Sequence, residues 1–139
     1  MTEAPILSYP NPNAWYQLYT DASHKGLRAV LGQKDSQGRN RVIAYASTSL
    51  NSGKQHYAPV HLECRGVVWA IRQFHHYLHG QEFDVYTDQE ALKSLLKQGP
   101  DALANRTMGR WIHELQQHHF TVHYHPGPKN CTDFLSRAL

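Results

Sequence analysis

Alternating hydrophobic and polar residues predict five β-strands along the chain. The first three follow one another as Trp15–Asp21, Leu27–Gln33 and Arg41–Ser47, with turn-forming Gly and Asn residues between the second and the third. We expect these three strands to form a meander. The other two, Phe83–Asp88 and His119–Tyr124, are short, and helical segments separate them from the meander and from each other.

Apolar residues at steps of three and four predict the helices. The clearest helix begins at Pro59, carries apolar residues from Leu62 to Leu78 and ends before Gly80. The remaining helices are predicted, in chain order, at Glu90–Gln98, at Ala102–Gln117 and from Cys131 to the C-terminus. The order βββαβαβα is typical of an α/β fold in which a five-stranded mixed sheet carries helices on both faces.

Length and composition limit the class of protein. A chain of 139 residues suits one domain, and it has no apolar run near the roughly 20 residues that a membrane span needs. The 14 Lys and Arg against 11 Asp and Glu give a net charge of +3, which permits a polyanionic partner without requiring one. The 2 cysteines form no CxxC pair, and the first ten residues lack the basic and apolar regions of a signal peptide. We therefore expect an intracellular protein, in the cytoplasm or the nucleus.

Two predicted strands end with the same tripeptide, YTD, at residues 19–21 and 86–88. Ligands of α/β sheets usually bind at the carboxyl ends of strands, so Asp21 and Asp88 emerge close together if the two strands are neighbours. Paired carboxylates of this kind bind cations. The alternative is that each Asp is only a common turn residue at the end of a strand.

Two further acids are candidates for the same site. Glu63 lies early in the main helix, and its steps of four and eight residues to Val67 and Ile71 place it on the apolar side that faces the sheet. A carboxylate in that position needs a partner, unless it is a first-turn acid that the helix dipole favours and water still reaches. Asp133 begins the last predicted helix, where an Asp is also expected as a simple cap.

Blocks of residues spread over nearly the whole chain carry a family resemblance. They are APILSYP, YTDASHKG with AVLGQ, VIAYASTSL, HYAPVHLECRGVVWAI with FHHYLHG, FDVYTDQEALKSLL, RW and LQ three residues apart, FTVHYHPGPKN and DFLSR. In this order they resemble the ribonuclease H domain of retroelement reverse transcriptases, especially the gypsy-like type. The resemblance implies a ribonuclease H-like fold over residues 14–139, and it implies that residues 1–13 are a linker from a preceding polymerase-like region. The rest of a reverse transcriptase-like polyprotein is then an expected partner.

The resemblance implies four catalytic, metal-binding carboxylates, which map onto Asp21, Glu63, Asp88 and Asp133. They would hold two Mg²⁺ ions, with Mn²⁺ as a substitute, and Asp21 would bridge the two ions. By the same resemblance, the activity is hydrolysis of the RNA strand of an RNA/DNA hybrid, which leaves a 5′-phosphate on the RNA.

The resemblance also indicates how a hybrid is held. We expect contacts to the nucleic acid from Ser23, Lys25, Arg28, Gln89 and Asn130, with an ordinary solvated surface charge as the alternative for the two basic residues. His125, just before the Pro-Gly turn that leads to the last predicted helix, is the candidate for a role in product release.

Three positions depart from the family pattern. Only Cys131 and Thr132 separate Asn130 from Asp133, where the family usually has three residues, and a loss of one residue at a helix start rotates a side chain by about 100°. Arg28 stands where the family usually has Gly, and Gln89 where it usually has His. Two hypotheses therefore stay open: an active Mg²⁺-dependent endoribonuclease, or a catalytically impaired domain that serves as a nucleic-acid-binding or scaffolding module in a domesticated host protein.

The histidines do not predict a zinc site. The chain has 11 of them, but no HExxH motif, since His113 and His118 lie five residues apart. No set of four ligands shows the paired spacing that is usual for structural zinc.

Overall fold

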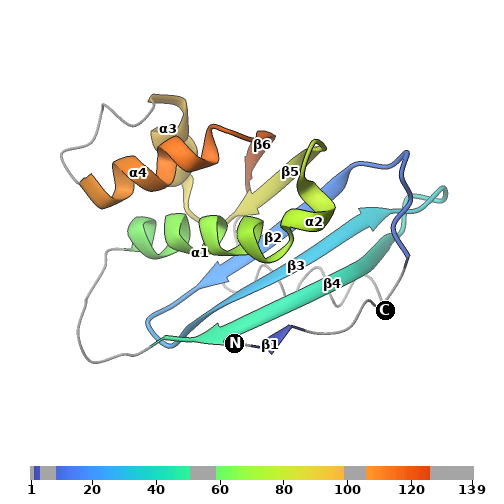
Figure 1. Ribbon diagram of the computed structural model, residues 1–139, viewed down its shortest axis with the longest axis horizontal. Helices are drawn as coiled ribbons and strands as arrows, with labels where there is room; N and C mark the ends of the chain where they lie inside the picture. The colour runs from blue at the N-terminus through green and yellow to red at the C-terminus, as the bar shows by residue number, and fades with distance from the viewer. Residues whose placement is uncertain (1, 4–8, 51–58, 99–105, 126–139) are drawn as a thin grey trace.

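A six-stranded mixed sheet lies at the centre of the computed structural model, which describes residues 2–3, 9–50, 59–98 and 106–125 (Figure 1). The strands are β1 (Thr2–Glu3), β2 (Tyr16–Ala22), β3 (Gly26–Lys34), β4 (Asn40–Ser49), β5 (Glu82–Thr87) and β6 (His119–Tyr124). They lie in the order β1-β4-β3-β2-β5-β6. Pairing is antiparallel from β1 to β2 and parallel from β2 through β5 to β6, so the sheet changes direction at β2.

The described helices pack together on one face of this sheet (Figure 1). They are α1 (Pro59–Gln73), α2 (His75–Leu78), α3 (Glu90–Gln98) and α4 (Arg106–Leu115). A single buried cluster joins them to the sheet, with Leu18 and Val85 from the strands, Phe74 beside α1 and Ile112 from α4 at its centre. Burial of side chains of this size stabilises the fold by about 1.5 to 3 kcal/mol each. No helix within the described residues is long and apolar enough to cross a membrane.

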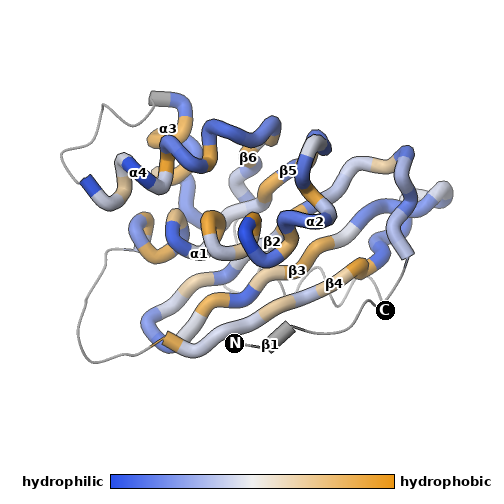
Figure 2. The backbone as a smooth tube through the Cα atoms, in the orientation of Figure 1, coloured by the Kyte–Doolittle hydropathy of each residue, from blue (hydrophilic) through white to orange (hydrophobic). Residues whose placement is uncertain are grey.

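Consecutive buried residues occupy the middle of β2 to β4, where Figure 2 shows hydrophobic stretches, so side chains on both faces of the sheet are buried there. On the face away from the main core, Tyr19, Val30 and Val42 form a smaller buried cluster against Tyr86. The rings of Tyr19 and Tyr86 are stacked, with centroids 4.4 Å apart and planes inclined by 6°. His123 from β6 stacks on the other side of Tyr86 at 4.9 Å.

The structure confirms the α/β class and the five predicted strands. The helix at residues 90–98 and the strand at residues 119–124 have the predicted bounds. β1 adds a sixth strand, because Thr2 and Glu3 pair with Ser47 and Ala46 at the outer edge of β4, within the segment predicted as a linker.

The main helix differs from its prediction. The periodic apolar residues indicated a single helix as far as Leu78, but the backbone of Phe74 leaves the helical region at ψ 22°, so α1 ends at Gln73 and α2 follows. Phe74 is fully buried, and its carbonyl accepts hydrogen bonds from Tyr77 and Leu78, so the short second helix continues from it. The start of the helix predicted at residues 102–117 and the whole helix predicted from Cys131 lie outside the described residues.

Candidate active site

Glu63 is a carboxyl group buried between two strands of the sheet and the main helix. Its residue is only 2% exposed, as the helical spacing predicted. Its Oε1 accepts a hydrogen bond of 2.6 Å from the Thr20 hydroxyl, and the Thr87 hydroxyl also hydrogen-bonds to it. The pKa of Glu63 is raised to about 8: burial is the largest cause, the charges of Asp88 and Asp21 also raise the pKa, and the two threonine hydrogen bonds lower it.

Asp21 lies near the end of β2, and Asp88 directly follows the end of the neighbouring strand β5. The parallel pairing of β2 with β5 puts Tyr19 opposite Tyr86, and each carboxylate follows its tyrosine by two residues. Burial raises the pKa of Asp88, and the nearby charge of Asp21 adds to this effect. The three acids thus lie within electrostatic reach of one another.

Thr20 and Thr87 are residues of the candidate site that the sequence pattern did not single out. Both are fully buried, and both give their hydroxyl to Glu63. The Thr87 Oγ1 also accepts the backbone N–H of Gln89 at 3.1 Å, which ties the start of α3 to the site. The repeated YTD tripeptide contained this signal, because its threonine recurs along with its aspartate.

Arg28 lies directly beside Asp21. The two residues face each other across the antiparallel pairing of β2 with β3, and the Arg28 Nη2 is 3.1 Å from the Asp21 Oδ2. The Asp21 side chain is 13% exposed and that of Arg28 is 52% exposed. The residue that departs from the family pattern therefore neutralises one of the candidate metal ligands.

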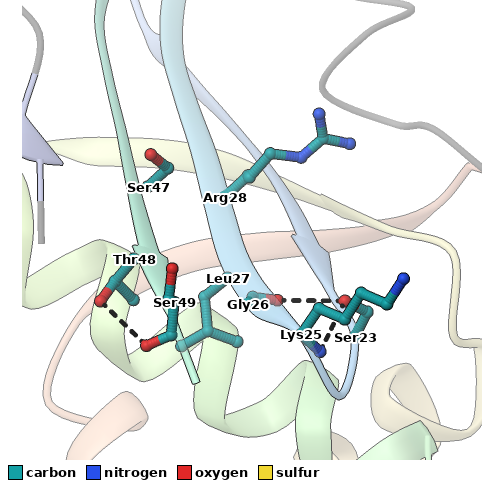
Figure 3. A pocket seen from close by; sticks show the side chains of 8 residues that line it. All are labelled: Ser23, Lys25, Gly26, Leu27, Arg28, Ser47, Thr48 and Ser49. Carbon is teal, nitrogen blue, oxygen red and sulfur yellow. Dashed lines mark hydrogen bonds between the residues drawn. The ribbon is translucent and has the colours of Figure 1, made fainter. Parts of the chain in front are cut away.

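A surface hollow of about 480 Å³ opens next to Arg28 at the β2–β3 hairpin and the end of β4 (Figure 3). Its lining is rich in hydroxyl groups and carries two cationic side chains: Ser23, Lys25, Gly26, Leu27, Arg28, Ser47, Thr48 and Ser49. Figure 3 shows Arg28 and Ser47 extending from neighbouring positions of β3 and β4. The predicted nucleic-acid contacts Ser23, Lys25 and Arg28 are thus brought together.

His125 lies at the other side of the carboxylates. Its backbone N–H donates to the Thr87 carbonyl at 2.8 Å, one residue before Asp88. Its ring meets Tyr19 and Tyr86 edge-on, with centroids 6.1 and 6.5 Å away. The structure therefore places His125 next to the predicted site, whereas Asn130 and Asp133 lie outside the described residues.

The donor chemistry of this site suits a hard divalent cation. Asp21, Glu63 and Asp88 offer only carboxylate oxygens, and their mutual repulsion is relieved by a bound positive charge. As they stand, no three His, Cys, Asp or Glu side chains among the described residues converge closely enough to hold a metal ion. Neighbouring Cys64 is fully buried, and burial raises the pKa of its thiol to about 12, so it stays protonated and packs as a small apolar residue.

Relatives of this chain are found among retroelement polyproteins. It is 35% identical over 143 residues to the retrovirus-related Pol polyprotein from transposon opus of Drosophila melanogaster, covering 99% of this chain and 14% of the relative. It is 34% identical over 138 residues to the Pol polyprotein from transposon gypsy of the same species, covering 98% and 13%. The chain thus spans about a seventh of the length of these relatives.

Solved structures of viral and cellular enzymes share the fold. The foamy viral protease-reverse transcriptase in complex with dsDNA superposes with a TM-score of 0.67 at 21% identity, over 86% of this chain and 25% of that one. The same enzyme in complex with an RNA/DNA hybrid gives 0.59 at 22% identity, over 85% and 16%. LC11-RNase H1, isolated from compost, gives 0.60 at 14% identity, over 85% and 89%. At these identities the likeness shows the fold.

The family model for the RNase H-like domain found in reverse transcriptase matches residues 11–118 of this chain. That range includes strands β2 to β5 and three of the four candidate carboxylates, whereas β1 and β6 lie outside it. The chain therefore belongs to the family of RNase H-like domains found in reverse transcriptases.

Proposed function

We propose that this chain is a divalent-metal-dependent ribonuclease H that hydrolyses the RNA strand of RNA/DNA hybrids. The observation that carries this proposal is the buried Glu63 carboxyl, held by two threonines and within electrostatic reach of Asp21 and Asp88. A fold of this class can keep its shape without the activity, so the site matters more than the likeness. The charge of Asp21 raises the pKa values of Glu63 and Asp88, so the three acids are costly to keep together unless a cation joins them.

The carboxylates would serve as the ligands of the metal. Asp21 is our candidate for the bridging ligand, with Glu63, Asp88 and Asp133 completing the set. When bound, two Mg²⁺ ions, or Mn²⁺ in their place, would activate a water for in-line attack on the scissile phosphate and stabilise the leaving 3′ oxygen. Thr20 and Thr87 orient the Glu63 carboxyl, so its oxygens are already positioned when the cation arrives.

The substrate would lie across the β2–β3 hairpin and the end of the sheet at which Asp21 and Asp88 are found. Lys25 and Arg28 line the hydroxyl-rich hollow with Ser23, a lining suited to a phosphate-sugar backbone. Gln89 and Asn130 would add further contacts to the nucleic acid, and His125 would assist release of the product. The foamy viral enzyme solved with an RNA/DNA hybrid supports this choice of substrate.

The parent protein is proposed to be an intracellular polyprotein of the reverse-transcriptase type. Residues 1–13 would connect the domain at residues 14–139 to a preceding polymerase region. The Pol polyproteins from transposons opus and gypsy support this arrangement, since the matching segment is a small part of each.

Cleavage of a labelled RNA/DNA duplex tests the proposal. We expect Asp21→Asn to abolish Mg²⁺-dependent cleavage, at least about a hundredfold, while the fold is kept, because the change removes a ligand charge but not the shape. Asp35→Asn is the matched control: Asp35 lies in the β3–β4 turn, where it pairs with Arg39 at 3.1 Å, and this variant should cut like the parent. Full activity of Asp21→Asn would contradict the proposal.

A second candidate function is favoured by one observation, the ion pair that places a guanidinium on Asp21. In this case the domain binds hybrids without cutting them. A gel-shift assay beside the cleavage assay, with Mg²⁺ and Mn²⁺ titrated, separates the two candidate functions. Binding of the hybrid without cleavage in both metals supports a domain that only binds. Insertion of one residue between Thr132 and Asp133 should then restore cutting if the shortened segment is the cause.

A further inference from the structure

The pair between Asp21 and Arg28 is built into the sheet. The two residues are direct cross-strand partners, and the two strands are joined by the short hairpin at residues 23–25. Their register leaves the guanidinium within 3.1 Å of the carboxylate. The arginine is held at the site by its own strand, so its local concentration there is high whatever the concentration of salt or metal.

A guanidinium and a divalent cation compete for the same oxygen lone pairs. The arginine guanidinium is a cation that has only hydrogen-bond donors. Two positive groups cannot both approach one carboxylate oxygen without strong repulsion. A cation that binds Asp21 through Oδ2 must therefore displace the Arg28 guanidinium.

The other two acids of the site, Glu63 and Asp88, still experience the negative charge of Asp21. The negative charge of Asp21 still raises the pKa values of Asp88 and Glu63, although Arg28 is beside it. Among the residues that the structure describes, the three acids do not converge as closely as a metal ion requires, and one Asp21 oxygen faces Arg28. Separation of Arg28 from that Asp21 oxygen would therefore make the oxygen available to a metal ion.

We propose that Arg28 is an internal counter-ion that competes with the divalent metal for Asp21 and thereby sets the metal concentration at which the site fills. This inference rests on the proposed function, because it requires Asp21 to be a metal ligand. Arg28 is a positioning residue here, since it acts through Asp21. Its side chain is half-exposed and lines the neighbouring hollow, so it can leave the carboxylate without being forced into the core.

The test is Mn²⁺ binding to the full chain without nucleic acid, followed by electron paramagnetic resonance of the free ion. We expect Arg28→Gln to lower the dissociation constant for Mn²⁺ by roughly two- to fivefold, the range of a partly exposed ion pair. Arg28→Lys keeps the charge and should bind Mn²⁺ close to the parent value. Arg39→Gln removes an equal charge at the other end of β3, where Arg39 pairs with Asp35, and should leave the constant unchanged.

The variants also separate this inference from the function on which it rests. Equal or weaker Mn²⁺ binding by Arg28→Gln, in a protein whose Asp21→Asn variant loses binding, overturns the role of Arg28 and leaves the metal site intact. Mn²⁺ binding by Asp21→Asn that equals the parent's overturns both. An equal gain in Arg39→Gln and Arg28→Gln means that only net charge matters, and this too overturns the proposal. Circular dichroism spectra confirm that each variant is folded.

Discussion

Thr20 and Thr87 are the uncharged hydrogen-bond partners of Glu63. Each hydroxyl has one proton to donate, and each gives it to the same buried carboxyl. These hydrogen bonds favour the charged form of Glu63 and so work against burial, which favours the neutral form. Two short polar side chains thereby make it easier for a buried carboxyl group to ionise.

Replacement of Thr20 should move the Glu63 titration. In Thr20→Val the donor is lost while the branched shape is kept, so we expect the pKa of Glu63 to rise above its value of about 8. Thr20→Ser keeps the hydroxyl and should titrate near the parent. The measurement is ¹³C NMR of the glutamate side-chain carboxyl against pH, without metal. An unchanged or lower pKa in Thr20→Val would show that the hydrogen bond has little weight.

The same group makes the stability of the metal-free protein depend on pH. A glutamate with an ordinary pKa of 4.5 loses its proton in the unfolded chain, whereas Glu63 keeps it in the folded protein up to about pH 8. The free energy of unfolding should therefore fall as pH rises from about 4.5 to about 8, by roughly 5 kcal/mol. Asp88, with its pKa also raised, adds to the fall.

Urea unfolding in EDTA at several pH values measures this dependence. Glu63→Gln keeps the shape and the acceptor oxygen but cannot ionise, so its stability should change less over the same pH range. It should also exceed that of the parent at pH 8. A variant with the parent's full slope would assign the dependence to other groups.

At the scale of elements, the hairpin of β2 and β3 depends on a close approach to β4. A Cβ at Gly26 would lie 2.5 Å from the Thr48 carbonyl oxygen, which is backbone and cannot turn aside. Gly66 in α1 differs, because a Cβ there would meet Ala22 at 3.4 Å, an ordinary contact. The first glycine is required by space, and the second is not.

Alanine at each glycine should therefore have opposite effects. We expect Gly26→Ala to destabilise the protein by about 1 to 3 kcal/mol, since β3 or β4 must shift to relieve the clash. Gly66→Ala should be neutral, or stabilising by up to about 1 kcal/mol, because alanine favours a helix over glycine. Thermal unfolding of the two variants side by side checks both. A harmless Gly26→Ala would mean that the two strands are less tightly paired than described.

The accuracy of the sequence predictions follows how local each element is. Strand 119–124 and helix 90–98 were predicted with their observed bounds, because their periodicity lies within the element. Glu63 was correctly expected on the sheet-facing side for the same reason. The break at Phe74 and the pairing of β1 depend on packing with distant residues, which a periodic pattern does not contain.

In the candidate site too, features that depend on local sequence could be predicted, and features that depend on strand register could not. The twin YTD motif predicted two strand ends whose acids lie within electrostatic reach of each other, and the parallel pairing of β2 with β5 agrees with it. The contact of Arg28 with Asp21 could not be predicted, because it requires the exact register of the hairpin. A metal shared by Asp21 and Asp88 stays a prediction, as does the role of Asp133.

At the scale of the whole molecule, β2 joins two halves of different construction. On one side lie the antiparallel strands β3 and β4, which bring Arg28 and the hollow, and on the other lie the parallel strands β5 and β6, which bring Asp88 and His123. The helix α1 crosses between the halves and delivers Glu63 to their junction. A bound cation at this point would hold both halves together.

Divalent metal should therefore stabilise the whole fold and not only the site. We expect Mg²⁺ at about ten times its dissociation constant to raise the unfolding free energy by about 1.4 kcal/mol, or the melting temperature by roughly 3 to 6 °C. Asp21→Asn should gain much less. Differential scanning calorimetry, with KCl at equal ionic strength as the control for screening, measures the effect. An equal rise in KCl would mean that charge screening alone is responsible.

The stacked rings of Tyr19 and Tyr86 have a further consequence. Each tyrosine precedes one of the paired aspartates by two residues on its own strand, and the rings lie 4.4 Å apart and nearly parallel. At this separation the electronic transitions of the two phenol rings couple, so the near-ultraviolet circular dichroism of the protein depends on how β2 lies against β5. The protein thus contains an intrinsic optical probe of the spacing between its two carboxylates, which can be followed during metal or nucleic-acid addition without any label.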